Sequence, residues 1–289
     1  MKIIQSFAEF DEGNNYLCGE QTNKKYLNLY SFLLSYLTLQ KYYSKVIMFC
    51  NQKAYDSFIK YIPYEDVKIL ENPNTFKFWS YYKIEAMRTM KEKFIHVDSD
   101  VFIFDDLYSP FINTRKYDII VQDTIPARIN ACATFVENNK KFLKENNIID
   151  YNLYDRRSFS CGTVGLTPKL IPEYIGLCDI LKEAYLNNKL FDTHPLGMIL
   201  EELSLYLFMI NNDLRVHEVL PHNEVLEHGI EKVGNLRKYT HMWFGNKFNP
   251  QIIKAIKLKI KKEFPNKYQI IEKYEKDVLN KEVLEKYII

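Results

Sequence analysis

The sequence predicts an α/β fold with a mostly parallel central sheet. Short apolar runs alternate with helical patterns through the first half of the chain, as in proteins whose parallel strands are joined by helices. At 289 residues, the chain is long enough to bury a large core without disulfides or a structural metal. Hydrophobic residues make up 47% and charged residues 26%, which is ordinary for a globular protein.

The expected elements follow from hydrophobic periodicity. Apolar runs predict strands at residues 3–7, 46–50, 67–70, 94–97, 118–122, 159–166 and 214–219. Apolar residues at helical spacing predict helices at 27–43, 52–61, 77–91, 171–187 and 195–210. The chain beyond residue 250 is Lys-rich and helical, with a break near Pro265. We therefore expect a main domain over residues 1–250 and a basic helical appendage over 251–289.

Charge and cysteine content exclude several classes of protein. With 39 basic and 37 acidic residues, the chain lacks the basic excess of proteins that hold nucleic acid by its phosphates, so no nucleic-acid partner is expected. The five cysteines are odd in number and form no C-x-x-C motif, which argues against a disulfide framework or zinc knuckle and favours a reducing compartment. The apolar stretch at the N-terminus is too short for a signal peptide, and no apolar window reaches the roughly 18 residues of a membrane span. A cytoplasmic protein is expected.

Two carboxylates follow the predicted strand at 94–97. Asp98 and Asp100 are separated by one residue, and apolar residues resume at 101–104. Because the chain bends beyond a strand, such carboxylates can converge on one cation, and Mg²⁺ or Mn²⁺ prefers carboxylate oxygens together with phosphate oxygens. A solvated loop is the alternative for a bare Asp-x-Asp triplet. The apolar flanks on both sides favour a metal–phosphate site at the end of the strand, where parallel sheets bind ligands.

Two enzyme classes carry Asp-x-Asp after a strand. Haloacid-type phosphatases use the first Asp as nucleophile and the second as acid/base, normally on the first strand of the domain, whereas about four elements precede Asp98. Nucleotide-sugar glycosyltransferases of the GT-A fold, a Rossmann-like nucleotide-diphospho-sugar transferase fold, carry the motif at about the fourth strand, after a nucleotide-binding half. The position of Asp98 favours the second class. A phosphatase or phosphotransferase and a non-catalytic nucleotide-sugar binding protein stay open as alternatives.

The wider context resembles glycogenin-like and bacterial lipooligosaccharide galactosyltransferases. Four motifs occur in the same order over about residues 76–250. They are an aromatic-x-x-x-Lys helix with Trp79 and Lys83, a Phe-Asn-x-Gly-Val-like segment at 159–166, a helix with Glu201 and Glu202, and a late His-x-x-Gly-x-x-Lys-like segment at 239–247. An uncharacterised bacterial domain family with a Trp-x-x-x-Lys helix and a His-Val-Asp-x-Asp-Val-Phe strand is a still closer match in pattern.

This resemblance implies an activity and a metal site. The activity is Mn²⁺- or Mg²⁺-dependent transfer of a sugar, with retention, from a nucleotide-diphosphate donor, expected to be a UDP-sugar, to a glycan, lipid-linked or protein acceptor. Asp98 would contact the ribose and the metal, Asp100 would bind the metal, and His241 would be the third protein ligand. Lys247 would neutralise the diphosphate leaving group, although the gap between His241 and Lys247 is longer than the usual one.

The resemblance also implies residues around the donor. Trp79, Lys83, Cys161 and Gly162 are candidates for donor binding, and Cys161 stands where the family has Asn or Ala. The alternative for Trp79 is core packing. Lys83 could reach a phosphate or pair with an acid of the Asp-x-Asp strand, and the alternative is a solvated position on its helix.

Three further residues are candidates for the reacting centre. Gln122 and Asp123 close the predicted strand at 118–122, where they would hydrogen-bond the donor sugar or form an ordinary strand-end turn. Glu202 would contact the acceptor or the reacting sugar face, the alternative being a solvated helix start. If the reaction inverts the sugar, a general base must reach the acceptor hydroxyl, and Glu202 or Asp123 would take that part.

The basic tail carries an amphipathic pattern. Ile252, Ile253, Ile256 and Ile260 share one helix face next to lysines. Such a helix can lie on an anionic membrane, so residues 251–262 are a candidate for peripheral contact with the inner face of a membrane. The alternative is a helix whose Ile stripe packs on the main domain.

Overall fold

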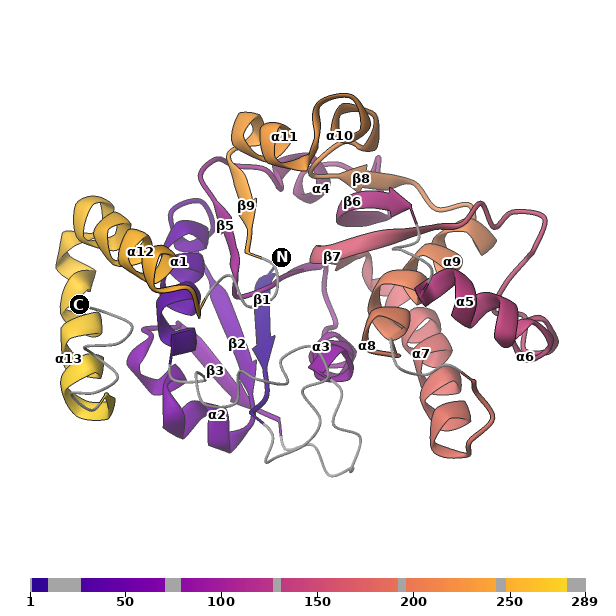
Figure 1. Ribbon diagram of the computed structural model, residues 1–289, viewed down its shortest axis with the longest axis horizontal. Helices are drawn as coiled ribbons and strands as arrows, with labels where there is room; N and C mark the ends of the chain where they lie inside the picture. The colour runs from indigo at the N-terminus through magenta and orange to yellow at the C-terminus, as the bar shows by residue number, and fades with distance from the viewer. Residues whose placement is uncertain are drawn as a thin grey trace. The chain divides into compact units, whose positions relative to one another are not determined.

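The computed structural model describes residues 2–9, 27–70, 79–126, 131–191, 196–242 and 248–279. The chain divides into two compact units, each assembled from several segments (Figure 1). One comprises Ile3–Thr75, Asp98–Asp106 and Lys238–Ile289, and we call it the β1 unit. The other comprises Met1–Lys2, Phe76–Val97 and Leu107–Arg237, and we call it the β7 unit.

Parallel strands joined by helices form the centre of the β1 unit. Strand β1 (Lys2–Phe7) pairs with β2 (Val46–Cys50), which pairs with β3 (Asp66–Ile69), and both pairings are parallel. Helix α1 (Asn28–Gln40) connects β1 to β2, and residues 28–39 are all buried, which explains its broad apolar pattern. Helix α2 (Gln52–Ser57) and the 3₁₀ turn η2 (Ile59–Tyr61) connect β2 to β3.

An aromatic cluster joins these elements. The rings of Phe7, Phe32 and Phe58 pack edge to face, with centroids 5.0–5.6 Å apart. This arrangement suits the ring quadrupoles and adds to the burial of apolar surface. Strand β1, helix α1 and the α2–η2 connection therefore share one core.

The β1 unit also contains a short antiparallel pair that the periodicity did not predict. Strand β5 (Val101–Ile103) lies beside β9 (Tyr239–His241) (Figure 1). The C-terminal helices α12 (Pro250–Glu263) and α13 (Tyr268–Val278) belong to this unit as well, separated by a 3₁₀ turn (Pro265–Lys267) at the expected break.

Helix α12 packs against α1 (Figure 1). The side chains that it buries are Ile253, Ile256 and Ile260, each at most 4% exposed. The Ile stripe therefore faces the protein, as the packing alternative predicts.

In the β7 unit, the strand order is β4 (Phe94–Val97), β7 (Arg157–Leu166), β6 (Ile119–Pro126), β8 (Val216–Glu218). Strand β7 is antiparallel to both β4 and β6, whereas β6 and β8 are parallel. A Cβ atom on Gly165 would lie 2.6 Å from the carbonyl oxygen of Phe94 and 2.7 Å from Ile120. Only glycine therefore allows β7 to fit between its neighbours here.

Helices complete the β7 unit. They are α3 (Trp79–Arg88), α4 (Ser109–Ile112), α5 (Ala131–Asn138), α6 (Lys140–Glu145), α7 (Ile171–Leu186), α8 (Leu196–Met198), the π-helical segment η4 (Ile199–Leu203), α9 (Ser204–Asn211), α10 (His222–His228) and α11 (Ile230–Arg237), with a 3₁₀ turn at Pro168–Leu170. The α/β class predicted from the alternating pattern is confirmed. Within the described residues, no helix combines the length and the apolar composition that crossing a bilayer requires.

Candidate metal site

Asp98 and Asp100 lie on a tight turn that directly follows β4. The amide nitrogen of Val101 donates to the carbonyl oxygen of Asp98 at 3.0 Å, so the chain reverses within four residues. Both aspartates are partly buried, and Ser99 between them is only 8% exposed. The turn therefore holds two carboxylates close together at the surface of the protein, as the Asp-x-Asp spacing predicts.

His241 reaches this turn through the strand pair β5–β9. His241 is the register partner of Val101, and the amide of Met242 donates to the carbonyl of Asp100 at 2.9 Å. Main-chain hydrogen bonds thus continue from the β5–β9 ladder into the turn. They hold the backbone of His241 next to the two aspartates without any contribution from its side chain.

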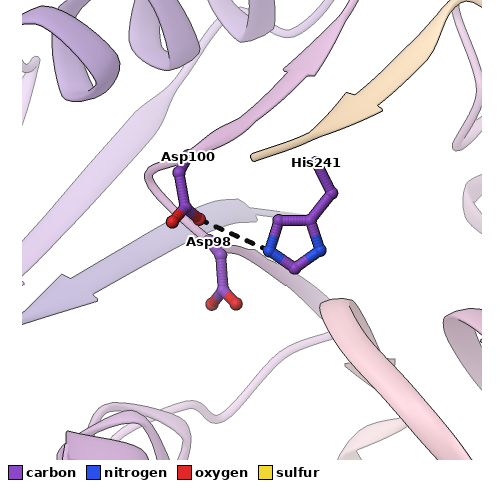
Figure 2. A group of neighbouring side chains, drawn as sticks. All are labelled: Asp98, Asp100 and His241. Atoms are coloured by element: carbon purple, nitrogen blue, oxygen red, sulfur yellow. Dashed lines mark ion pairs between the residues drawn. The ribbon is translucent and has the colours of Figure 1, made fainter. Parts of the chain in front are cut away.

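The three side chains converge (Figure 2). One ligand atom from each of Asp98, Asp100 and His241 lies within 4.8 Å of the other two. The Nε2 atom of His241 is 3.5 Å from Oδ1 of Asp100, and these side chains are only 15% and 13% exposed. Carboxylate oxygens with one imidazole nitrogen are donors that Mn²⁺ and related divalent ions accept, so the residues fit the predicted metal.

Two buried polar side chains that the sequence analysis did not single out contact this turn. Gln5 lies in β1 and Ser35 in α1, both 0% exposed, and both donate to the carbonyl oxygen of Asp98. The only available signal was a polar residue inside an apolar strand and another on the buried face of a helix.

Lys83, predicted to bind the donor, forms a buried ion pair within the β7 unit. Its Nζ contacts Oε1 of Glu201 and donates to the carbonyl of Cys161 at 2.8 Å. Lys83 is 2% and Glu201 3% exposed, so the alternative of a solvated lysine is wrong. Burial is tolerated because each charge meets its opposite. Donor binding by Lys83 and Cys161 stays a prediction.

Glu201 and Glu202 lie on the π-helical segment η4, between α8 and α9. The thiol of Cys161 donates to the carbonyl of Glu201 at 3.5 Å, and Ser204 Oγ donates to that of Leu200 at 2.7 Å. Side chains from β7 and α9 thus satisfy carbonyls of this irregular turn. Such π-helical turns are frequent at functional sites. The part of Glu202 in catalysis stays a prediction.

Near Lys83, His96 is fully buried in β4. Burial, together with the positive charge of Lys83, holds the pKa of His96 well below its ordinary value, so its imidazole is neutral. Gly162 follows Cys161 in β7 and is likewise buried.

Gln122 and Asp123 do not end their strand. Strand β6 continues to Pro126, so the alternative of a strand-end turn is wrong, and both side chains are 0% exposed. The register against β7 shifts between Val121 and Asp123, and the carbonyl of Gln122 accepts from Leu220 at 2.8 Å. Their part in catalysis stays a prediction.

Two other predicted donor residues have no described side chain. Trp79 is the first residue of α3, and its side chain lies outside the described residues. Lys247 also lies outside them.

Comparison with solved structures finds several of low similarity. 4-Diphosphocytidyl-2C-methyl-D-erythritol synthase from Anaerococcus prevotii is 16% identical with a TM-score of 0.38, over 75% of this chain and 86% of that one. The bifunctional glycosyltransferase WbbM is 12% identical with a TM-score of 0.49, over 93% and 51%. Mouse xyloside xylosyltransferase 1 is 10% identical with a TM-score of 0.44, over 84% and 98%.

At the level of sequence, no curated protein matches the chain. A family model matches residues 1–274, so the chain belongs to DUF6734, a family of unknown function.

Proposed function

We propose that this protein is a metal-dependent glycosyltransferase of the GT-A type. It would transfer a sugar from a nucleoside-diphosphate donor, expected to be a UDP-sugar, to a hydroxyl of a glycan, lipid-linked or protein acceptor. The observation that carries the proposal is the convergence of Asp98, Asp100 and His241, because two distant segments of the chain supply one cation-binding group of three ligands.

The chemistry of these ligands suits a diphosphate substrate. Three protein ligands leave coordination positions open on Mg²⁺ or Mn²⁺, and such ions fill them with water and substrate phosphate oxygens. When bound, the cation would stabilise negative charge on the departing diphosphate. Asp98 and Asp100 would hold it as carboxylates, and His241 as neutral imidazole, because a protonated ring has no lone pair to offer.

Other parts of the site follow from the motif resemblance and remain part of the proposal. Trp79, Lys83, Cys161, Gly162 and Lys247 would contact the donor. Within the β7 unit, the contacts of Lys83 with Glu201 and with the carbonyl of Cys161 join α3 to β7 and η4.

The reacting centre would involve three more side chains. Gln122 and Asp123 would contact the donor sugar, and Glu202 would contact the acceptor or the reacting sugar face. All three lie in the β7 unit, on β6 and η4.

The test is turnover of a donor. Wild-type protein is incubated with Mn²⁺ and a panel of nucleotide sugars, and released nucleoside diphosphate is measured. We expect slow hydrolysis of one donor, faster turnover when an acceptor is added, and loss of both with EDTA or in Asp100→Ala.

Two results would assign the site to another function. Phosphate release from para-nitrophenyl phosphate without turnover of any donor would indicate a phosphatase. Saturable donor binding without turnover, across glycan and lipid-linked acceptors, would indicate a binding protein.

We further propose that α12 brings the enzyme to an anionic membrane surface through its basic outer face. This face comprises Lys254, Leu258, Lys261 and Lys262; all four are exposed, and Leu258 is 61% exposed. The Ile stripe is occupied by packing, so attraction between lysines and acidic headgroups would dominate, with Leu258 as a small apolar contact.

A further inference from the structure

We propose that Gln5, Ser35 and Tyr64 are positioning residues that fix the main chain of Asp98 and thereby the geometry of the metal site. The inference rests on the proposed metal-dependent function, and it concerns residues outside every motif described above. All three residues and the metal site belong to the β1 unit.

A chain of hydrogen bonds connects these residues to the turn. Tyr64 Oη donates to Oε1 of Gln5 at 2.8 Å, and Nε2 of Gln5 donates to Oγ of Ser35 at 2.8 Å. Gln5 Nε2 and Ser35 Oγ also reach the carbonyl oxygen of Asp98, at 3.5 and 3.4 Å. Both protons of the Gln5 amide and the hydroxyl proton of Ser35 thus have an acceptor in the network.

Tyr64 sets the orientation of the Gln5 amide. Burial raises the pKa of Tyr64 well above its ordinary value, so the hydroxyl keeps its proton and can donate it to Oε1 of Gln5, whereas the carbonyl oxygen of Asp98 can only accept. The amide oxygen therefore faces Tyr64, and the amide nitrogen faces Ser35 and Asp98. The ring of Tyr64 is itself held edge to face against Tyr36, with centroids 4.9 Å apart.

The Asp98 carbonyl is the common acceptor. It receives the Val101 amide of the turn at 3.0 Å, besides the two longer side-chain contacts. Each long contact is weak alone, but they come from two separate elements, β1 and α1, and meet on one atom in a partly buried position.

One turn further along α1, the helix also forms a hydrogen bond with β5. Thr38 Oγ1 accepts from the amide of Ile103 at 3.4 Å. Polar groups three residues apart on the buried face of α1 thus contact the chain before and within β5. The carboxylates of Asp98 and Asp100 project from this held segment, and β9 adds His241 to it.

Small displacements matter at such a site, because metal ligands must be held to within about 0.5 Å of the productive geometry. Groups that orient metal ligands through hydrogen bonds typically change metal affinity or activity by roughly 10- to 100-fold when removed. The Gln5–Ser35–Tyr64 network is in the position to have such an effect through the Asp98 carbonyl.

The test compares two serines of α1. Ser35→Ala removes a contact to Asp98, whereas Ser31→Ala removes a buried hydroxyl one turn earlier that donates to Asn28 at 3.2 Å. Mn²⁺ alone is titrated into each purified protein, and free Mn²⁺ is measured by electron paramagnetic resonance. We expect Kd to rise roughly 10-fold in Ser35→Ala and to stay at the wild-type value in Ser31→Ala.

A second variant and a second readout guard against misfolding. Tyr64→Phe should weaken Mn²⁺ binding in the same direction, because the Gln5 amide loses its fixed orientation. Hydrogen exchange of the Val101 amide should accelerate in Ser35→Ala and Tyr64→Phe and not in Ser31→Ala, with metal absent. Thermal unfolding identifies any variant that has lost its fold.

Two outcomes overturn the inference, and they differ in what else they overturn. Equal Mn²⁺ affinity in wild type, Ser35→Ala and Tyr64→Phe removes the positioning role and leaves the proposed function intact. No Mn²⁺ binding by wild-type protein removes the proposed metal site and, with it, the positioning role.

Discussion

His241 Nε2 lies 3.5 Å from Oδ1 of Asp100, and this proximity is produced by main-chain pairing between β5 and β9 rather than by the side chains themselves. Because the ladder places His241 opposite Val101, either side chain can be replaced without removing the hydrogen bonds that hold the other one in position. The contribution of each ligand can therefore be measured in a folded protein.

Asp100→Asn should weaken Mn²⁺ binding by at least about 10-fold. This is the lower limit typical of removing a group that orients a metal ligand without itself contacting the metal. A neutral amide is a poorer ligand for a hard cation than a carboxylate. Electron paramagnetic resonance of free Mn²⁺ measures the change. Asp105→Asn is the matched control, since Asp105 is exposed and pairs with Lys238. Equal affinity in the two variants would exclude Asp100 as a ligand.

His241→Ala should abolish Mn²⁺-dependent release of nucleoside diphosphate and leave the thermal unfolding midpoint nearly unchanged. The β5–β9 ladder is made of main-chain groups that the substitution retains. Thr240→Ala, at an exposed neighbouring position of β9, serves as the control and should retain activity. Retained activity in His241→Ala would exclude the imidazole from the metal site.

Lys83→Met should destabilise the protein by about 3–5 kcal/mol, because it leaves the buried Glu201 carboxylate without its lysine. Lys83→Met combined with Glu201→Gln should recover much of that loss, since the second change removes the stranded charge. Urea unfolding measures both. If Lys83 served only the donor, the single variant would lose donor affinity at full stability.

Arg215→Gln should change how stability depends on pH. Arg215 Nε donates to Asp118 at 2.9 Å, and this hydrogen bond lowers the pKa of the Asp118 carboxyl below its ordinary value. A lowered pKa in the folded state contributes stability above the unfolded pKa of about 3.9 and loses it as pH falls through the folded pKa. We expect wild type to be slightly more stable than Arg215→Gln at pH 7, and the difference should be small because Arg215 is largely exposed and solvent screens the pair.

Urea unfolding from pH 7 to pH 2.5 measures the difference in free energy of unfolding between wild type and Arg215→Gln. This difference should shrink below about pH 4. Arg156→Gln is the control, because Arg156 is exposed and forms no ion pair with the residues that the structure describes. If the stability difference between wild type and Arg215→Gln stayed constant from pH 7 to pH 2.5, the contact with Arg215 would not lower the pKa of Asp118.

Lys254→Glu combined with Lys261→Glu should reduce binding to vesicles containing phosphatidylserine by at least about 10-fold, given about 1 kcal/mol per lysine near an acidic surface. Cosedimentation at low and high salt measures it. Lys144→Glu with Lys189→Glu makes the same charge change at exposed positions of the β7 unit and should bind as wild type. Equal losses in both variants would indicate a net-charge effect, and no binding by wild type would remove the membrane proposal.

Local patterns were enough for several elements of the first half of the chain. Strands β1, β2 and β4 are short, mostly apolar runs, and helix α1 has a broad apolar face, so their type and place follow from periodicity. The same holds for the Asp98–Asp100 turn, because an apolar run on each side fixes where the strand stops. Short elements such as β5, β9 and α10 were missed, since the two strands have only three residues each and α10 has no buried residue to give an apolar pattern.

The environment of the candidate site residues could not be predicted from local sequence patterns. Lys83 looked equally suited to solvent or phosphate, because its partner Glu201 is distant in sequence and only packing brings the two together. Gln5 and Ser35 looked like minor irregularities in apolar segments, because a hydrogen bond to the Asp98 carbonyl leaves no trace in the residue pattern.

The residue types and spacing of one segment were therefore enough to predict two ligands of the candidate metal site, whereas the fold brings the third candidate ligand to them. Two aspartates beyond a buried strand are a local feature. His241, the third candidate ligand, joins them because β9 pairs with β5, and buried polar groups of β1 and α1 donate to the carbonyl of Asp98 in the turn. Both relationships are contacts between residues far apart in the chain, which no local pattern can specify.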